Sequence, residues 1–564
     1  MNPKSPVWIS TLAILMLLGS AKFAEASQGI AIEEANKAPQ PMLAANQTST
    51  VIPLRQVAED IGATVTWNHA QNSVTVKRGT NQWRLKPESH STELNGRPIK
   101  MDKPAVLQKG TIYVSIGAFI KAMNADITWD EKTGIEVASS DIATRASYFM
   151  RLIMEGKTEQ AGKMLSEDLS KAITETGLKE LGKTYHAAYG RLGAIQKLSV
   201  NRSAIHQNAN LEYTLPKGGE LSVTVRFDHR GNVDDLFITS MLGENYEQPA
   251  YDNPDSYNEH EVIVGEGTYA LPGTLTVPEG KGPFPAVVLV HGSGPNDRDS
   301  SIGAAKMFRD LAVGLADRHI AVLRYEKRTR EHALKSDSGF FTVKEETIDD
   351  ALAAVKRLQQ DPRIDAEKIF VLGHSQGGML IPRILEQDMS SSIHGALIMA
   401  GPSKPLEDIM LWQYNHMLEL AKSIGAPREQ VSGLEQQLAF FKTQLVLLKD
   451  SSFSQYDGLP GFQLPHPEWW YDFRNFYGGD LARKQKVPML IVQGDNDMQV
   501  SADNLEGWKQ ALAERNNVTF KLYSKLNHLF VPSESKSTGA EYFLPGNVPA
   551  TVIQDVADWI QSQL

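Results

Sequence analysis

The chain has 564 residues, of which 41% are hydrophobic and 22% charged, a composition typical of globular protein. This length exceeds what one hydrophobic core holds, so we expect three domains. The net charge of −10 gives no broad basic surface for nucleic acid. The absence of cysteine excludes disulfides, thiol catalysis and cysteine metal ligands.

The first 26 residues predict a secretory signal peptide. Lys4 precedes an apolar run from about Val7 to Leu18, and Ala24-Glu25-Ala26 forms a small-x-small cleavage site. The run is short for a membrane span, and no other stretch approaches the roughly 18 apolar residues that a span needs. We therefore expect a secreted or cell-envelope-associated bacterial protein with no membrane span after signal cleavage.

Residues 48–139 contain a repeat. The segments VIPLRQVAEDIGATVTWN and YVSIGAFIKAMNADITWD align 62 residues apart, and Trp67 is matched by Trp129. Each copy predicts a short helix leading into a strand, so we expect a small α+β domain built by duplication. The pattern resembles the copper-amine-oxidase N-terminal-like domain, which implies an appended stalk without a copper site. We interpret Trp67 and Trp129 as core residues.

Residues 141–243 change character. Helically spaced apolar residues come first, and LEYTLPKGGELSVTVRFDHRGNVDDLFIT then predicts three strands joined by glycine-containing turns. The segment resembles a small α+β domain of unknown function, with a nuclear-transport-factor-like cone, that precedes secreted hydrolases. We interpret His206 and His229 as surface residues.

After a polar linker, residues 261–564 predict an α/β domain. Apolar runs that suit strands alternate with helical stretches, which is typical of a parallel sheet covered by helices. The chemistry of such sheets gathers at the carboxyl ends of the strands. The strand-like runs are residues 286–290, 320–323, 369–372, 396–399, 489–492 and 519–523.

The sequence GHSQGG, residues 373–378, is the first candidate for chemistry. The pattern G-x-S-x-G is weak alone, but here a strand-like run precedes it and a helical pattern follows it. Strand, sharp turn and helix form the nucleophile elbow of an α/β-hydrolase, in which glycines let backbone segments approach closely. We predict that Ser375 is a nucleophile, and we interpret His374 as a packing residue.

The loop HGSGP, residues 291–295, follows another predicted strand. It is like the H-G-x-G segment that supplies a backbone N–H to an oxyanion hole. We therefore assign the oxyanion-hole N–H groups to Ser293 and Gln376. His291 is expected to bond to the loop backbone.

The loop QGDNDMQV, residues 493–500, offers two candidates for a triad acid. Spacing favours Asp497, which leaves Asp495 as a turn former. Histidine follows the acid in the chain order of this fold, and His528 is the only histidine beyond Asp497. The predicted triad is Ser375, Asp497 and His528.

Residues 267–564 resemble a bacterial α/β-hydrolase family related to dienelactone hydrolases and prolyl-oligopeptidase-type enzymes. The resemblance is carried by LPGTLTVPEGKGPFPAVVLVHGSGPNDRD, VLGHSQGG, VPMLIVQGDNDMQV and LNHLF. It implies a serine carboxylesterase or related acyl hydrolase without a metal or organic cofactor. We expect a small-molecule acyl ester as substrate and an acyl-enzyme as intermediate.

A long insertion at about residues 404–480 predicts a helical cap over this site. Its segment HPEWWYDFRNFY places Trp469 and Trp470 together. These indoles are candidates for the substrate pocket, and anchoring of the cap on the core is an equal alternative.

Two other functions stay open. A serine exopeptidase would use the same triad, with Glu407 and Asp408 as candidates to hold a peptide amino terminus. A non-catalytic cell-envelope protein would bind through residues 48–243, with cell-wall polymer as its candidate partner. A binding scaffold, however, has no reason to keep a strained elbow.

Overall fold

The computed structural model describes residues 50–564 except 217, 240–244, 339–340, 451 and 453–460. The chain divides into two compact units, an N-terminal unit within Phe23–Met241 and a C-terminal unit within Leu242–Leu564. The predicted signal peptide, residues 1–26, lies outside the described residues. Within the described ranges, no helix is long and apolar enough to cross a membrane.

The first half of the N-terminal unit has the predicted repeat. In each copy a strand runs into a helix and a two-stranded hairpin follows, and the leading strands of the two copies pair antiparallel. Trp67 and Trp129 pack against the buried core, as predicted. The elements are β1 (Val51–Pro53), α2 (Leu54–Asp60), β2 (Thr64–Asn68), β3 (Ser73–Arg78), β4 (Asn81–Leu85), β5 (Ser91–Leu94), β6 (Arg97–Lys100), β7 (Val106–Gln108), β8 (Thr111–Ser115), α3 (Ile116–Met123), β9 (Ile127–Asp130) and β10 (Gly134–Val137).

The second half has helices first and an antiparallel four-stranded sheet afterwards, in the order β11-β12-β13-β14. The predicted helix-to-sheet order is confirmed, and β11 is an additional strand. The elements are α4 (Ile142–Met154), α5 (Thr158–Gly162), α6 (Glu167–Ala172), α7 (Glu175–Tyr189), β11 (Ile195–Arg202), β12 (Gln207–Thr214), β13 (Glu220–Phe227) and β14 (Val233–Thr239).

The two predicted surface histidines differ. His229 is exposed, as expected. His206 is buried, so that prediction was wrong. A tight turn, in which the Ser203 N–H donates to the His206 carbonyl, holds the ring against β14, and its Nε2 lies 2.8 Å from Asp234 Oδ2.

The two halves share one compact unit. The buried Arg78 guanidinium of β3 donates to the Met123 carbonyl at 3.3 Å and to the hydroxyls of Thr144 and Ser147, on α4, at 3.0 and 3.3 Å. The predicted division near residue 140 therefore falls inside a packed body. The separate domain limits stay a prediction.

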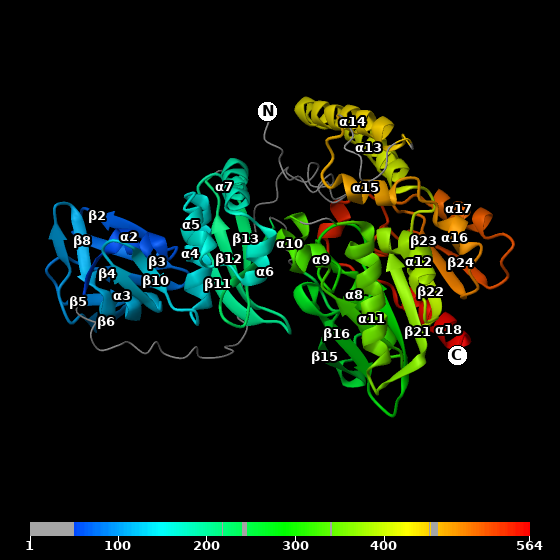
Figure 1. The fold of residues 1–564 in the computed structure, drawn as a ribbon, viewed down its shortest axis with the longest axis horizontal. Helices are drawn as coiled ribbons and strands as arrows, with labels where there is room; N and C mark the ends of the chain where they lie inside the picture. Colours follow the sequence, from blue (N-terminus) through cyan, green and yellow to red (C-terminus); the bar gives the residue numbers. More distant parts are fainter. Residues whose placement is uncertain (1–49, 217, 240–244, 339–340, 451, 453–460) are drawn as a thin grey trace. The chain divides into compact units, whose positions relative to one another are not determined.

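The C-terminal unit is built on an eight-stranded sheet in the order β15-β16-β20-β17-β21-β22-β23-β24 (Figure 1). The six strands from β20 to β24 in this order are parallel, as predicted, and β15 and β16 add an antiparallel edge. The strands are β15 (Tyr257–Val264), β16 (Leu271–Pro278), β17 (Phe284–Val290), β20 (Ala321–Tyr325), β21 (Ile364–His374), β22 (Ile393–Met399), β23 (Met489–Gly494) and β24 (Val518–Tyr523).

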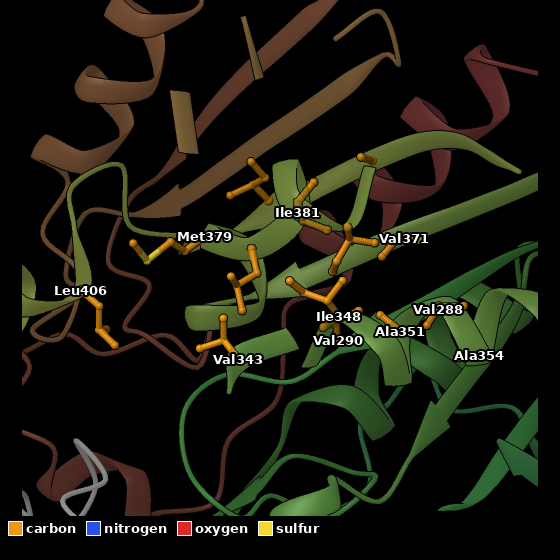
Figure 2. Close-up of a cluster of buried hydrophobic side chains, with 14 of the residues drawn as sticks. Val288, Val290, Val343, Ile348, Ala351, Ala354, Val371, Met379, Ile381 and Leu406 are labelled. Carbon is orange, nitrogen blue, oxygen red and sulfur yellow. The ribbon is translucent and has the colours of Figure 1, made fainter. Parts of the chain in front are cut away.

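Helices cover both faces of this sheet, which explains why its central strands are continuous apolar runs. On β17, Val287 and Leu289 face the cluster that contains residues of α8 (Met307–Ala316) and α18 (Ala550–Ser562). Val288 and Val290 face the cluster that contains residues of α11 (Asp349–Gln359) and α12 (Gln376–Gln387). Figure 2 shows the second cluster, with Val288, Val290 and Val371 of the sheet beside residues of the covering helices. The carboxyl ends of the strands thus stand on a packed base.

The remaining elements of the C-terminal unit are helices, single turns and one small hairpin. In chain order they are η1 (Pro254–Ser256), η2 (Gly267–Tyr269), β18 (Ser301–Ile302), β19 (Ala305–Lys306), α8 (Met307–Ala316), α9 (Arg328–Glu331), α10 (Ala333–Ser338), the π-helical turn η3 (Lys344–Ile348), α11 (Asp349–Gln359), α12 (Gln376–Gln387), α13 (Leu406–Ser423), α14 (Arg428–Leu448), α15 (Pro467–Phe473), α16 (Gly478–Ala482), α17 (Asp503–Ala511), η4 (Ala540–Phe543) and α18 (Ala550–Ser562).

Candidate active site

Ser375 stands between the end of β21 and the start of α12, as the sequence predicted. Its backbone has φ of 55° and ψ of −121°, in a region that residues other than glycine rarely adopt. Such strain persists only where the surroundings enforce it. The buried strand on one side and the buried first turn of α12 on the other enforce it here.

The glycines of the elbow are required by close backbone contacts. A Cβ on Gly373 would lie 2.3 Å from the Gly377 carbonyl oxygen, and a Cβ on Gly377 would lie 2.5 Å from the carbonyl oxygens of Val290 and His291. No side chain fits at either position without moving backbone. The start of α12 therefore packs directly on the carboxyl end of β17.

Asp497 and His528 form a buried pair. The His528 Nδ1–H donates to Asp497 Oδ2 at 2.7 Å, which leaves Nε2 free to act as a base. The other carboxylate oxygen, Oδ1, accepts the N–H groups of Gln499 and Val500, both at 2.8 Å. Asp495 instead accepts the Lys525 N–H at 2.6 Å, which is the turn-forming contact predicted for it.

His374 makes a contact that the sequence did not reveal. Its Nε2–H donates to the backbone carbonyl of His528 at 2.9 Å, and the two rings lie 4.7 Å apart. Burial, together with the neighbouring His528, holds the pKa of His374 well below the ordinary value, so the ring stays neutral. The residue before Ser375 thus fixes the loop that carries His528.

The predicted oxyanion loop runs past the elbow. A Cβ on Gly292 would lie 3.0 Å from the Ser375 Cβ, so the Gly292–Ser293 peptide is adjacent to the nucleophile. Gln376 is the first residue of α12, where backbone N–H groups have no partner within the helix. The Ser293 hydroxyl donates to Gln376 Oε1 at 2.7 Å and ties the two positions together.

His291 bonds to backbone, as expected. Its Nε2–H donates to the Tyr325 carbonyl at 2.6 Å. Burial lowers the pKa of His291 to about 4, so the imidazole is neutral near pH 7.

Ser375 and His528 line one cavity of about 20 Å³. No carboxylate lies among its lining residues in the described chain. They are Gly292, Ser293, Asn296, Ser300, Ile302, His374, Ser375, Gln499 and His528.

Comparison with known proteins gives one family match in the N-terminal unit and another in the C-terminal unit. Residues 31–137 match the copper amine oxidase N-terminal domain, and residues 287–536 match the alpha/beta hydrolase family. Esterase EstD of Thermotoga maritima is 39% identical over 343 residues, which cover 61% of this chain and 77% of EstD. The chain belongs to the α/β-hydrolase family.

The solved structures that match part of this chain include two esterases. An esterase of Pyrococcus furiosus matches with a TM-score of 0.34 and 14% identity, over 58% of this chain and 98% of the esterase. Est1E of Butyrivibrio proteoclasticus matches with a TM-score of 0.34 and 14% identity, over 54% of this chain and 98% of Est1E.

The front module of this α/β-hydrolase matches a domain that is named for copper enzymes. Residues 50–137 are all described, and they contain no group of three histidine, aspartate or glutamate side chains close enough to hold an ion. Residues 50–137 therefore offer no donor set of this kind for a copper ion.

The predicted cap corresponds to the helical insertion from α13 to α16, in which α13 packs beside α14 (Figure 1). Trp470 is buried in the main core cluster with Phe441, and Trp469 donates its Nε1–H to Glu346 Oε2 at 2.6 Å. Arg383 of α12 also pairs with Asp472 of the cap, at 2.9 Å. The bond to Glu346 favours the anchoring alternative for Trp469, whereas the ring contact of Trp470 with Phe441 of α14 lies within the insertion.

Neither tryptophan lines the cavity at Ser375, so their role in substrate binding stays a prediction. The acidic pair considered for an exopeptidase is engaged elsewhere. Glu407 is buried and accepts the Asn475 N–H at 2.7 Å, and burial raises its pKa. Asp408 pairs with Lys449 at 2.5 Å.

Proposed function

We propose that this α/β-hydrolase is a serine carboxylesterase that hydrolyses esters of short acyl groups. One observation carries the proposal: Ser375, on a strained elbow, and His528, bonded to a buried carboxylate, line the same cavity. The name of the relative EstD, an esterase, supports it.

In the first half of the reaction, Ser375 Oγ attacks the ester carbonyl carbon and His528 Nε2 takes the serine proton. Asp497 keeps the imidazole in the correct tautomer and stabilises the imidazolium. The carbonyl oxygen becomes an oxyanion that accepts the N–H groups of Ser293 and Gln376, each worth about 3 kcal/mol.

In the second half, the imidazolium returns its proton to the departing alcohol and leaves an acyl group on Ser375. Water then attacks the acyl-enzyme, with His528 again taking the proton. As the second tetrahedral intermediate collapses, the His528 imidazolium returns this proton to Ser375 Oγ, which restores the serine and releases the carboxylic acid. Every proton moves among Ser375, His528, the departing alcohol and water, so the proposed cycle needs no cofactor.

The small volume of the cavity beside Ser375 supports the proposal that the acyl group of the substrate is short. A cavity of about 20 Å³ is close to the space that one water occupies. Asn296 and Gln499 make part of its lining polar, which does not suit a long alkyl chain.

The test is hydrolysis of p-nitrophenyl esters from acetate to decanoate by the wild type and by Ser375→Ala, with Ser390→Ala as an exposed-serine control. We expect turnover highest on acetate, and Ser375→Ala to lower kcat at least about 10⁴-fold. Equal activity in Ser375→Ala would refute the proposal. Aminoacyl p-nitroanilides run in parallel, because cleavage of these alone would favour the exopeptidase.

We also propose export of the protein, on the pattern of Lys4, the following apolar run and Ala24-Glu25-Ala26. Detection of a mature form that begins near Ser27 in the culture medium or cell envelope would support it. A cell-wall contact of the N-terminal unit stays a prediction.

A further inference from the structure

Behind the predicted oxyanion hole lies a buried ion pair that the triad does not use. Lys327 Nζ is 2.7 Å from Glu346 Oε1, and the side chains are only 2% and 4% exposed. Burial of two charges costs desolvation, and an apolar pair of similar volume is often as stable. Stability alone therefore does not account for this pair, and the groups that the two charges contact indicate a further role.

Lys327 holds the peptide that carries one oxyanion donor. Its Nζ donates to the Gly292 carbonyl oxygen at 2.8 Å. This carbonyl and the Ser293 N–H belong to the same planar peptide and, in the trans form, point in opposite directions. An ammonium fixed on the carbonyl therefore sets the direction of the Ser293 N–H and also polarises that N–H toward an incoming oxyanion.

Glu346 reaches the second donor position. Its Oε2 accepts Gln376 Nε2 at 3.2 Å and, from the cap, Trp469 Nε1 at 2.6 Å. Because the Ser293 hydroxyl donates to Gln376 Oε1, the contacts close a circuit from Lys327 to the loop, to Gln376 and back to Glu346. The circuit connects both donor positions.

The backbone around Glu346 is unusual. Glu346 lies in the middle of η3, a π-helical turn, and such turns are rare and often occur at functional sites. Ile348 of the same turn belongs to the buried cluster that contains Val290, the last residue of β17 (Figure 2). Packing of Ile348 in this cluster therefore holds η3 next to the oxyanion loop, which follows Val290.

We propose that Lys327 and Glu346 are positioning residues for the oxyanion hole, which orient the Ser293 and Gln376 N–H groups without touching the substrate. The inference rests on the proposed esterase function.

The test compares Lys327→Met and Glu346→Gln with a matched control pair. Arg328 and Asp350 form the adjacent ion pair, at 2.5 Å, with side chains 13% and 5% exposed, and within the described residues neither bonds to the oxyanion loop or the elbow. Arg328→Met and Asp350→Asn therefore report the general effect of breaking an ion pair in this region. Thermal midpoints of all four variants show which of them fold.

The decisive readout is the inhibition constant of a trifluoromethyl ketone, to which Ser375 adds to give an oxyanion adduct. We expect Lys327→Met and Glu346→Gln to lower kcat/KM for p-nitrophenyl acetate about 10- to 100-fold, with KM within about threefold. The inhibition constant should rise by a similar factor. The control variants should change both values less than about threefold.

An unchanged inhibition constant, or equal losses in the control variants, would overturn the inference. If Lys327→Met fails to fold, the isosteric Glu346→Gln decides. In a double variant we expect no further loss beyond the larger single loss, because the pair acts as a unit. If the wild type neither turns over esters nor binds the ketone, the proposed function itself fails, and the inference with it.

Discussion

His291 is a buried neutral residue whose titration makes the C-terminal unit sensitive to acid. Its pKa falls to about 4 in the fold, below the ordinary 6.5, because burial disfavours the charged ring. Between pH 6.5 and 4, His291 binds a proton in the unfolded chain but not in the folded chain. The contribution of neutral His291 to the free energy of unfolding is therefore present above pH 6.5 and is lost as pH falls toward 4. The loss is at most about 3 kcal/mol.

We therefore expect His291→Gln to flatten the pH dependence of the thermal midpoint. The glutamine amide can still donate to the Tyr325 carbonyl but does not titrate. Between pH 6.5 and 4 the midpoint of the wild type should fall by several degrees more than that of the variant. Parallel profiles across this range would contradict the assignment.

The residues that could be predicted from the sequence are those marked by a local motif or by their order in the chain. Ser375 has its elbow motif, and His528 is identified because it alone follows Asp497. The bond from His374 to the His528 carbonyl joins residues 154 apart and has no local signal. Lys327 and Glu346 were missed for the same reason, since a charged side chain in an unremarkable segment is usually solvated.

The helix α15 offers a test at the element scale, because it decides between an anchor and a pocket wall. Trp470 is buried in the core cluster with Phe441, 6.5 Å away between ring centroids. We expect Trp470→Ala to destabilise the C-terminal unit by about 3–5 kcal/mol, by loss of buried area and creation of a cavity.

In Trp470→Ala, the order of activity on p-nitrophenyl esters from acetate to decanoate should be the same as in the wild type. Trp412→Ala is the control, since Trp412 is a cap tryptophan outside the core cluster that stacks on His416. A broader acyl range without a lower thermal midpoint would instead make Trp470 a wall of the substrate pocket.

The six parallel strands could be predicted because a strand that is buried on both faces has a continuous apolar sequence. β15 was missed because its sequence, YNEHEVIV, carries four polar or charged residues in a row before its apolar end, and none of these four is buried. The π-helical turn η3 was not predictable, since its sequence KEETI fits an ordinary helix start.

At the scale of the whole molecule, composition and length predicted three domains, and contact density gives two units. The difference arises because α4 packs on the duplicated module through Arg78, a contact between segments that are distant in sequence. The hydrophobic cores of the two units are nevertheless distinct sets of residues. All three residues of the proposed triad belong to the C-terminal unit.

This separation of cores predicts that damage to the N-terminal core leaves the chemistry intact. Trp83 of β4 is fully buried in the N-terminal core, with its ring 6.5 Å from Phe119. We expect Trp83→Ala to cost about 3–5 kcal/mol and to lower the thermal transition of that unit by about 10 °C. Hydrolysis of p-nitrophenyl acetate at 25 °C should not change.

Calorimetry and activity after heating would follow the two units separately. The matched control is Trp508→Ala, because Trp508 is buried in the C-terminal core and donates its Nε1–H to the Gly401 carbonyl at 2.8 Å. This variant should lower the transition at which esterase activity is lost and leave the other transition in place. A common shift of both transitions in either variant would show that the two cores unfold as one cooperative body, and the N-terminal unit would then contribute to the stability of the active site.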